Sequence, residues 1–411
     1  MASCWPKSPV IIAFFFLVLL LISSAAASPA KNDSLFSRKV LRRMIRAKLQ
    51  RLNKPSNKTI QSSDGDVIDC IPFHLQPAFD QLKLRGQKPL MEPTERPKGS
   101  EIAGEVAEEM QTWRSAGEEC PDGTVAIRRT TYKDVLRARA VGRFGRKPAS
   151  RAWQDSAAGG GGGHEHAVGY SYGEYYGAKA SLSVWAPHVA TPNEFSLSQI
   201  WVISGSFGVD LNTIEAGWQV SPQLYGDSYP RFFTYWTTDS YQETGCYNLL
   251  CSGFVQTTNK IAIGAAISPI SSYYRGQFDI TLLVWKDPKH GHWWLEFGPG
   301  ILVGYWPSNL FNHLARHASM VQFGGEIFNS RATGPHTLTQ MGSGHFAGEG
   351  FRRAAYFRNL QVVDWGNSLL PLSGLRVLAD HPTCYDIRGG GNRVWGNYFY
   401  YGGPGRNVRC P

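Results

Sequence analysis

Two glutamates stand out because each lies in an otherwise apolar run that alternates like a β-strand. In residues 212–220, alternation places Glu215 and Gly217 on one face and aliphatic or aromatic side chains on the other. Glu326 has the same relation to Gly324 in a later run. We expect the glycines to leave room for a substrate backbone, and the apolar surroundings to raise the pKa of each carboxyl. Glutamates that face water on edge strands would show the same pattern.

Other reactive patterns are weaker. No G-x-S-x-G nucleophile motif occurs. His313 and His317 are four residues apart on a helix predicted over 308–321, but Leu314 stands where metalloprotease helices carry a glutamate. The remaining close histidine pairs are His164 with His166 and His290 with His292. We interpret all of them as ordinary polar side chains and expect neither a metal nor an organic cofactor.

The N-terminus predicts a secretory signal peptide over residues 1–27. A polar start with Lys7 precedes an apolar run over 10–22, and small residues lead to a cleavage position after Ala27. The run is shorter than the roughly 20 residues that span a membrane. No later segment is longer or more apolar, so we expect a secreted protein with no membrane contact after signal removal.

The cysteines agree with export. Cys4 leaves with the signal, and an even number remains: Cys70, Cys120, Cys246, Cys251, Cys384 and Cys410. Even numbers in an oxidising compartment indicate disulfides, although composition does not fix their pairing. Proximity in the chain favours Cys246–Cys251 and Cys384–Cys410, which leaves Cys70–Cys120. Asn32 and Asn57 lie in sequons and are predicted glycosylation sites.

The net charge of +10 does not indicate a nucleic-acid ligand once it is located. From residue 152 onward the chain has 16 basic and 17 acidic side chains, whereas the first 151 residues have 26 and 15. The whole basic excess therefore lies in the N-terminal third. The near-neutral remainder is expected to bind neither nucleic acid nor an anionic membrane.

Composition divides the chain after the signal. Residues 34–52 predict a basic amphipathic helix, and a short helical stretch is expected near 105–113. A second basic stretch leads into five consecutive glycines at 159–163, which are typical of a flexible linker. We therefore predict a pro-region over 28–148, a linker over 149–165 and a working domain over 166–411.

The working domain reads as all-β, because short alternating runs recur between turn residues. Strands are predicted at 180–185, 196–203, 231–238, 260–267, 278–285, 292–297 and 301–306. The expected fold is an antiparallel β-sandwich, preceded by a mixed, partly helical pro-domain.

Several ordered motifs resemble the plant neprosin family. In the working domain they lie at 195–201, 212–220, 244–249, 253–256, 304–307, 324–326 and 341–346, and in the pro-region at 64–70 and 76–80. The resemblance covers nearly everything after residue 60. It implies a glutamic endopeptidase that cuts after proline in acid, made as a zymogen whose pro-region inhibits it. The family's two catalytic glutamates correspond to Glu215 and Glu326.

Some residues depart from the family pattern. Ser252 and Ala347 replace frequent prolines, and Phe323 replaces a common tryptophan beside the Glu326 motif. Phe323 is therefore expected to reshape the pocket, which makes proline preference less secure than glutamate catalysis. We expect a monomer acting on peptide or protein substrates in the extracellular space, cell wall or vacuole. The alternative is a non-catalytic secreted β-sandwich that binds cell-wall glycan or peptide through its tryptophans and tyrosines.

Overall fold

A computed structural model describes residues 30–80, 88–100, 110–115, 117–138, 140–147, 163–331 and 333–411. It divides the chain into two compact units, residues 1–48 and 49–411. Helix α2 (Ala30–Leu52) supplies the described part of the first unit and is the amphipathic helix expected over 34–52. The predicted signal peptide, most of the linker and most of the stretch near 105–113 lie outside the described residues. Within the described ranges, no helix is both long and apolar enough to cross a membrane.

The pro-region part of the second unit is a small sheet with a short helix. Strands β1 (Lys58–Gln61), β2 (Val67–Pro72) and β3 (Thr124–Arg128) pair antiparallel in that order. Helix α3 (Tyr132–Arg137) follows and begins with a capping box, in which Thr131 and Asp134 each accept the other's backbone N–H. The pro-region is therefore mixed, as the sequence predicts.

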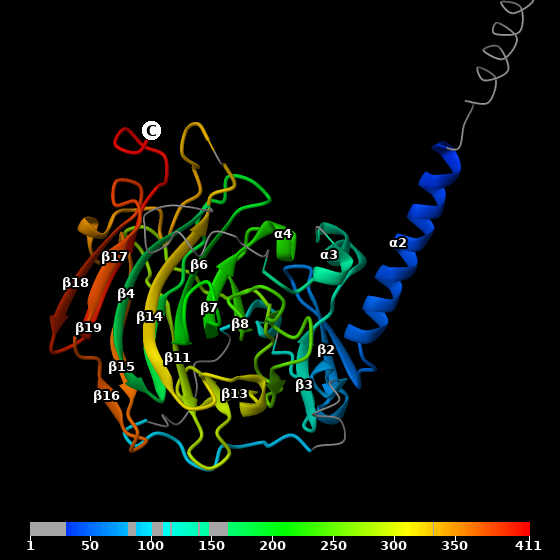
Figure 1. Cartoon of the computed structure of the whole chain (residues 1–411), viewed down its shortest axis with the longest axis horizontal. Coiled ribbons are helices and arrows are strands. Elements are labelled where there is room, and N and C mark those ends of the chain that lie inside the picture. Colours follow the sequence, from blue (N-terminus) through cyan, green and yellow to red (C-terminus); the bar gives the residue numbers. More distant parts are fainter. Residues whose placement is uncertain are drawn as a thin grey trace, which may run out of the picture. The chain divides into compact units, whose positions relative to one another are not determined.

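The rest of the unit consists of two antiparallel sheets, which confirms the predicted all-β sandwich (Figure 1). One sheet has the order β17-β4-β14-β6-β7-β8-β9. Its strands are β4 (His164–Tyr175), β6 (Phe195–Ser204), β7 (Asn212–Val220), β8 (Arg231–Thr237), β9 (Cys246–Tyr247), β14 (Ala318–Phe328) and β17 (Arg376–Ala379). A short helix, α4 (Pro222–Tyr225), follows β7.

The second sheet has the order β10-β13-β12-β11-β5-β15-β19-β18, with β16 paired to β15. Its strands are β5 (Gly177–Ser183), β10 (Val255–Gln256), β11 (Asp279–Lys286), β12 (Trp293–Phe297), β13 (Ile301–Trp306), β15 (Ala355–Val363), β16 (Leu369–Pro371), β18 (Asp386–Asn392) and β19 (Gly396–Gly402). Apolar residues of both sheets form one buried cluster between them.

Strand β7 shows why the sequence alternates. Ile214, Ala216 and Trp218 are buried in the core between the sheets, and the Trp218 indole N–H donates to the Ser183 carbonyl at 2.9 Å. Glu215 therefore lies on the opposite face of its sheet. There the neighbouring strands form a separate apolar cluster, which includes Leu197, Trp201, Phe233 and Tyr235.

Two local expectations are wrong. The helix predicted over 308–321 is a single 3₁₀ turn (Ser308–Leu310), a loop and the start of β14, because the apolar residues from 318 onward fill the sheet. Residues 260–267 form isolated bridges instead of a strand, and two of these bridges are to the pro-region residues Gln111 and Ile127. Strand β4 begins at His164, inside the predicted linker.

Glutamine side chains of the pro-region pair with backbone of the sandwich in the way that a neighbouring strand would. Gln76 accepts from the Gln256 N–H at 2.8 Å and donates to the Gln256 carbonyl at 2.9 Å. Gln111 makes the same two bonds to Ala262, both at 2.8 Å. All four residues are buried. The pro-region thus completes the hydrogen bonding of an irregular part of the sandwich.

The three predicted disulfides are present. They are Cys70–Cys120 in the pro-region, Cys246–Cys251 beside β9, and Cys384–Cys410 near the C-terminus. The backbone at Asn57 is bonded to Cys70 and its side chain is exposed, which leaves this sequon accessible. Asn32 lies in α2.

Candidate active site

Strand register places the two predicted catalytic glutamates on one face of the seven-stranded sheet. Gln199 of β6 lies directly opposite Gly324 of β14 on one side and Gly217 of β7 on the other. Glu326 and Glu215 are each two residues from one of these glycines, toward opposite ends of their strands. Gly324, Gln199 and Gly217 thus lie side by side on three neighbouring strands, and Glu326 and Glu215 lie on opposite sides of this row of three residues.

The glycines serve the sheet itself, which corrects the expectation that they make room for substrate. A Cβ on Gly217 would lie 2.0 Å from the Ser198 carbonyl oxygen, on the neighbouring strand. A Cβ on Gly324 would lie 2.4 Å from the Ala167 carbonyl oxygen, and its φ of +149° is unfavourable for other residues. Close approach of adjacent strands is thus what requires glycine at both positions.

Glu215 is completely buried, and both of its oxygens are hydrogen-bonded. Oε1 accepts from the Tyr241 hydroxyl at 2.7 Å and from the Thr213 hydroxyl at 2.9 Å. Oε2 accepts from the Gln199 amide at 2.9 Å and from the Lys147 ammonium at 2.6 Å. Four donors hold this side chain in one orientation, so it is positioned before any substrate arrives.

Glu326 is equally buried but only half satisfied. Its Oε1 lies 2.6 Å from His164 Nδ1, whereas Oε2 has no hydrogen-bond partner among the described residues. Burial alone would raise the pKa of this carboxyl. The positive charges of Lys147 and His164 outweigh burial and lower the pKa of Glu326 to about 2. In this state the carboxyl is held ionised.

Lys147 belongs to the pro-region and occupies the site. Its side chain is 5% exposed, and its ammonium lies 4.9 Å and 5.0 Å from the ring centroids of Tyr235 and Tyr241. Burial opposes the charge of Lys147, but the two carboxylates outweigh it, so the pKa of Lys147 is raised. The ammonium is therefore a fixed countercharge to both glutamates.

Backbone contacts hold the segment before Lys147 against the sheet. The Gly145 carbonyl accepts from the Tyr247 N–H at 2.7 Å. Arg146 donates to the Glu243 carbonyl at 2.6 Å, and the Lys147 N–H donates to the Tyr235 hydroxyl at 3.3 Å. A Cβ on Gly145 would lie 2.7 Å from the Leu250 side chain. The pro-region thus fits closely over this end of the site.

A cavity of about 300 Å³ remains beside this segment. From the sandwich it is lined by His164, Asn193, Phe195, Gln219, Ser221, Gln223, Leu224, Tyr247 and Phe328. The Phe195 and Phe328 rings stack at 6.0 Å, and the His164 ring lies 5.0 Å from Phe328. Next to Glu326 the sandwich therefore offers an aromatic wall and a few polar groups, as ligand pockets commonly do.

Comparison with known families agrees with this architecture. Residues 192–404 match the family model described as Neprosin, and residues 59–170 match the model described as Neprosin activation peptide. This chain belongs to the neprosin family. Both glutamates lie in the neprosin domain, and Lys147 lies in the activation-peptide match. Together the matches support a peptidase that is made with an activation peptide.

Solved glutamic peptidases show partial similarity. Scytalido-glutamic peptidase, solved with a peptide-based transition-state analogue, is 11% identical to this chain and has a TM-score of 0.31. The match covers 59% of this chain and 98% of the peptidase chain. SCP-B, a member of the eqolisin family in complex with the tripeptide Ala-Ile-His, is 10% identical and has a TM-score of 0.30. This match covers 58% of the present chain and 96% of SCP-B. At such TM-scores the likeness establishes nothing about the neprosin domain.

A second junction joins the activation peptide to the neprosin domain through buried charge. Arg231 of β8 is fully buried and forms ion pairs with Asp66 of the pro-region and with Asp227 of its own domain. Its Nη2 lies 2.6 Å from Asp227 Oδ2. Arg128 donates to the other oxygen of Asp66 at 2.7 Å. Burial would lower the pKa of Arg231, but both aspartates outweigh it and raise the pKa. Asp66 is therefore shared by one arginine from each part.

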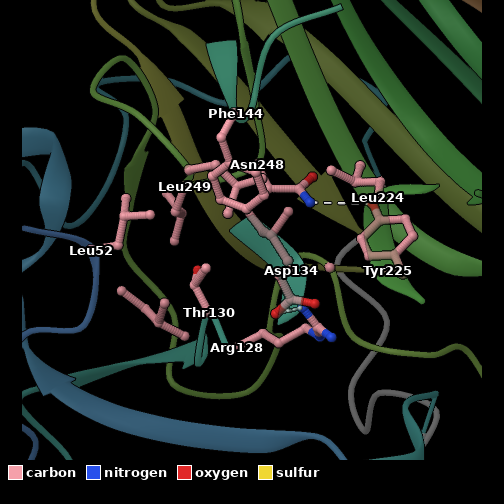
Figure 2. Close-up of a pocket in the computed structure, with 13 residues that line it drawn as sticks. Leu52, Arg128, Thr130, Asp134, Phe144, Leu224, Tyr225, Asn248 and Leu249 are labelled. Carbon is pink, nitrogen blue, oxygen red and sulfur yellow. Dashed lines mark hydrogen bonds and ion pairs between the residues drawn. The ribbon is translucent and has the colours of Figure 1, made fainter. Parts of the chain in front are cut away.

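Figure 2 shows the pocket beside this junction, a cavity of about 20 Å³. Arg128 and Asp134 meet at 3.6 Å on one side of it, and the Asn248 amide donates to the Tyr225 hydroxyl at 3.2 Å on another. Leu52, Phe144 and Leu249 supply apolar walls. Apolar packing and charge pairing thus both hold the activation peptide on the neprosin domain.

Sequence reasoning missed most of the residues that surround the glutamates. Gln199 was detectable, since it shares the alternating run of β6. His164 was noticed only as part of an isolated pair, and nothing in the sequence marked Lys147 among the many basic residues of the pro-region. The structure does not bring the other histidine pairs to the site: His313 binds Asp210 at 2.8 Å in a loop, and His290 and His292 stack on each other.

Phe323 does not face the site, which corrects another expectation. It is fully buried in the core between the sheets, and its ring packs edge-on against Phe357 at 6.3 Å. Glu326, three residues later, points to the other face of β14. The replacement of tryptophan at position 323 therefore changes core packing and not the pocket surface.

Proposed function

We propose that this protein is the secreted zymogen of an acid-acting glutamic endopeptidase in which Glu215 and Glu326 are the catalytic residues. One observation carries the proposal: two fully buried carboxyls lie on one face of the sheet, and a lysine of the activation peptide pairs with Glu215 and acts electrostatically on Glu326. Buried carboxylates are costly unless they are paired or used, and here the pairing cation belongs to the segment that activation removes.

Removal of Lys147 leaves two carboxyls that burial disfavours as a charged pair. One of them then stays protonated in acid, while the other remains ionised. The ionised carboxylate takes a proton from a water molecule as its oxygen attacks the carbonyl carbon of the scissile peptide bond. The protonated carboxyl stabilises the developing oxyanion by hydrogen-bonding to the carbonyl oxygen. As the C–N bond breaks, one of the two carboxyls, both protonated at this stage, gives its proton to the leaving nitrogen, which returns the pair to one protonated and one ionised carboxyl. The dyad titrates as a unit, so neither role is assigned to one glutamate.

The neighbouring side chains position the dyad. Tyr241, Thr213 and Gln199 fix Glu215 by donating to it, and His164 fixes one oxygen of Glu326. Glu326 Oε2, which is buried and unpaired among the described residues, is the oxygen that can accept a proton from water. This arrangement uses side chains alone, so the proposed chemistry proceeds without a metal or an organic cofactor.

Latency follows from the same contact. Lys147 occupies the hydrogen-bonding position beside Glu215, and its charge, with that of His164, holds the pKa of Glu326 far below the range in which a protonated carboxyl could serve. Acid favours release, because protonating Glu326 removes part of the attraction for the ammonium. Cleavage would follow after Lys147 or Pro148, so that the lysine leaves with the activation peptide; residues 148–150 lie outside the described part of the chain.

The proposed substrates are unstructured peptides or proteins, cut after proline. The aromatic wall of Phe195 and Phe328 beside Glu326 is a suitable surface for a proline ring, because a compact, rigid apolar ring packs on aromatic faces without needing hydrogen bonds. The three disulfides suit an oxidising, secreted location. Secretion, glycosylation at Asn32 and Asn57, and a monomeric state belong to the same proposal.

The test is cleavage of an unstructured proline-rich protein at acid pH by matured protein, with the products identified by mass spectrometry. Glu215→Gln and Glu326→Gln should each lower the rate by at least about 10²–10⁴-fold, the usual contribution of a general acid or base. Glu174→Gln, which alters an exposed strand residue, is the matched control. Full activity in either dyad variant would contradict the catalytic assignment.

The same digestion separates the proposal from its alternatives. Products that end in proline, with a matched peptide carrying alanine in place of proline left uncut, would establish the specificity. Cleavage without that preference would keep the peptidase and remove the proline assignment. No cleavage at any acid pH by correctly matured protein would favour the secreted binding protein.

A further inference from the structure

A second cluster of ionisable groups lies around Glu165 on β4. Its carboxylate is 4% exposed and is approached by two histidines from distant parts of the chain. His336 Nε2 lies 2.9 Å from each carboxylate oxygen, and His381 Nδ1 lies 2.8 Å from Oε2. Asn329 donates to Oε1 at 3.3 Å. The three ligand-type side chains have their donor atoms within 4.8 Å of one another.

The tautomer of His336 makes this arrangement informative. Its Nδ1 lies 3.0 Å from the Thr337 carbonyl oxygen, which can only accept, so Nδ1 carries the hydrogen. In the neutral ring the Nε2 lone pair then points directly at an ionised carboxylate, and two acceptors face each other. Something positive must lie between them, either a proton or a metal ion.

We propose that Glu165, His336 and His381 form a binding site for a divalent transition-metal ion, with zinc as the best match. Two imidazoles and one carboxylate are a common zinc ligand set, at metal–ligand distances of about 2.0–2.2 Å. Tetrahedral geometry at those distances separates ligand atoms by about 3.4 Å. The two histidine–carboxylate separations of 2.8 and 2.9 Å need to open by only about half an ångström, and all three ligand atoms lie within 4.8 Å of one another.

The surroundings fit such a site beyond the three ligands. The bond from His336 Nδ1 to a backbone carbonyl is the outer contact that metal-binding histidines usually make, and it fixes the ring orientation. His336 also packs against the buried Tyr385 ring at 5.6 Å. The His381 side chain is 44% exposed, so one side of the site is open to solvent for the entry of the ion and for a fourth ligand.

The proposed ion would join three separate segments: the start of strand β4, the loop around residue 336, and the segment that leads into the Cys384–Cys410 disulfide. Glu165 lies next to His164, which contacts Glu326 on the other face of β4. Metal at Glu165 therefore anchors the strand end that becomes the N-terminal edge of the mature domain. This last consequence rests on the proposed function, whereas metal binding itself does not.

The experiment is a titration of the untagged, chelator-treated full chain with Co²⁺ and then Zn²⁺ near neutral pH. We expect one equivalent of Co²⁺ to give visible absorption bands of a low-symmetry site, Zn²⁺ to displace it, and the melting temperature to rise with metal. Glu165→Gln, His336→Ala and His381→Ala should each weaken binding by at least about tenfold to a hundredfold, since even outer contacts contribute that much. His381→Ala removes a half-exposed side chain and is the variant least able to prevent folding.

His313→Ala is the matched control, because it removes another histidine–carboxylate pair, that with Asp210. It should leave the affinity unchanged. Absence of saturable binding would overturn the site, as would an unchanged affinity in His381→Ala or equal losses in His313→Ala. Activity of the dyad variants plays no part in this readout, so failure of the metal site and failure of the proposed function are distinguishable.

Discussion

Replacing Lys147 by methionine should open the site of the uncleaved chain. Methionine keeps most of the volume of the lysine stem but removes the ammonium that pairs with Glu215 at 2.6 Å and acts on Glu326. Glu326 then loses the largest influence that lowers its pKa. We expect the intact Lys147→Met chain to cleave a short quenched peptide that the intact unmodified chain cleaves far more slowly.

The structure sets the size of the effect and its pH dependence. A pKa of about 2 for Glu326, against an ordinary 4.5, sets an upper bound of about 3 kcal/mol in favour of the closed state, or about 300-fold in the open population, because His164 and His166 share in lowering the pKa. Because the pKa is lowered in the closed state, this contribution is complete above about pH 4.5 and is lost as the pH falls toward 2. About 1 kcal/mol is lost by pH 4 and about 2 kcal/mol by pH 3.

The assay is the ratio of the initial rates of the Lys147→Met and unmodified chains, with mass spectrometry confirming that each chain is still intact. Both have the same catalytic domain, so the pH dependence of catalysis cancels in the ratio. The ratio should be at most about 300 near pH 6 and should fall as the pH falls, to at most about 10 at pH 3. Lys58→Met, which removes an exposed ion pair with Glu118 in the pro-region, should give a ratio near one throughout.

Two outcomes would refute this reasoning. A ratio near one at all pH values would mean that Lys147 does not maintain latency. A large ratio that does not change with pH would mean that Lys147 acts by filling space and not through the ionisation of Glu326.

Two further substitutions test the framework around the site. Asp66→Asn should lower the free energy of unfolding of the full chain by about 3 kcal/mol, because it leaves the buried Arg231 with one carboxylate fewer. Thermal denaturation would measure this loss against the control Asp80→Asn, which removes the exposed ion pair with Lys54. Equal melting temperatures of the two variants would contradict the prediction. Gly217→Ala should lower the free energy of unfolding by about 3 kcal/mol or more, because the new Cβ clashes with the adjacent strand. The control is Gly348→Ala, whose Cβ meets no atom closer than 4.0 Å. Equal stability of the two variants would show that glycine at position 217 is not needed for strand packing.

The fold was largely predictable because strand alternation is a local property. In β7 every second residue enters the core, so the pattern alone placed Glu215 on the outer face. The helix predicted over 308–321 failed because its apolar positions fit a buried strand as well as a helix, and pairing with β4 and β6 decided between them. Periodicity in short apolar segments does not distinguish these cases.

The site was predictable only in part, because its other members come from separate segments. The resemblance identified both glutamates, but the partners of Glu326 and Glu215 depend on how β4 and the pro-region fold over the sheet. Lys147 carries no local signal: it is one basic residue among many, and burial between two carboxylates is what makes it special. Glu165, His336 and His381 are similarly far apart in the chain and meet only through the tertiary structure.

The hydrogen bonds that Gln76 and Gln111 make to the sandwich have a consequence for the stability of the mature enzyme. They occupy the backbone groups of Gln256 and Ala262, which the sandwich does not satisfy with a strand of its own. We therefore expect the activation peptide to act as a folding template, because it stabilises a conformation that loses four hydrogen-bond partners of its backbone when the peptide departs. The mature domain would then persist through a high unfolding barrier rather than a large equilibrium stability, and once unfolded it would refold poorly without the segment it has discarded.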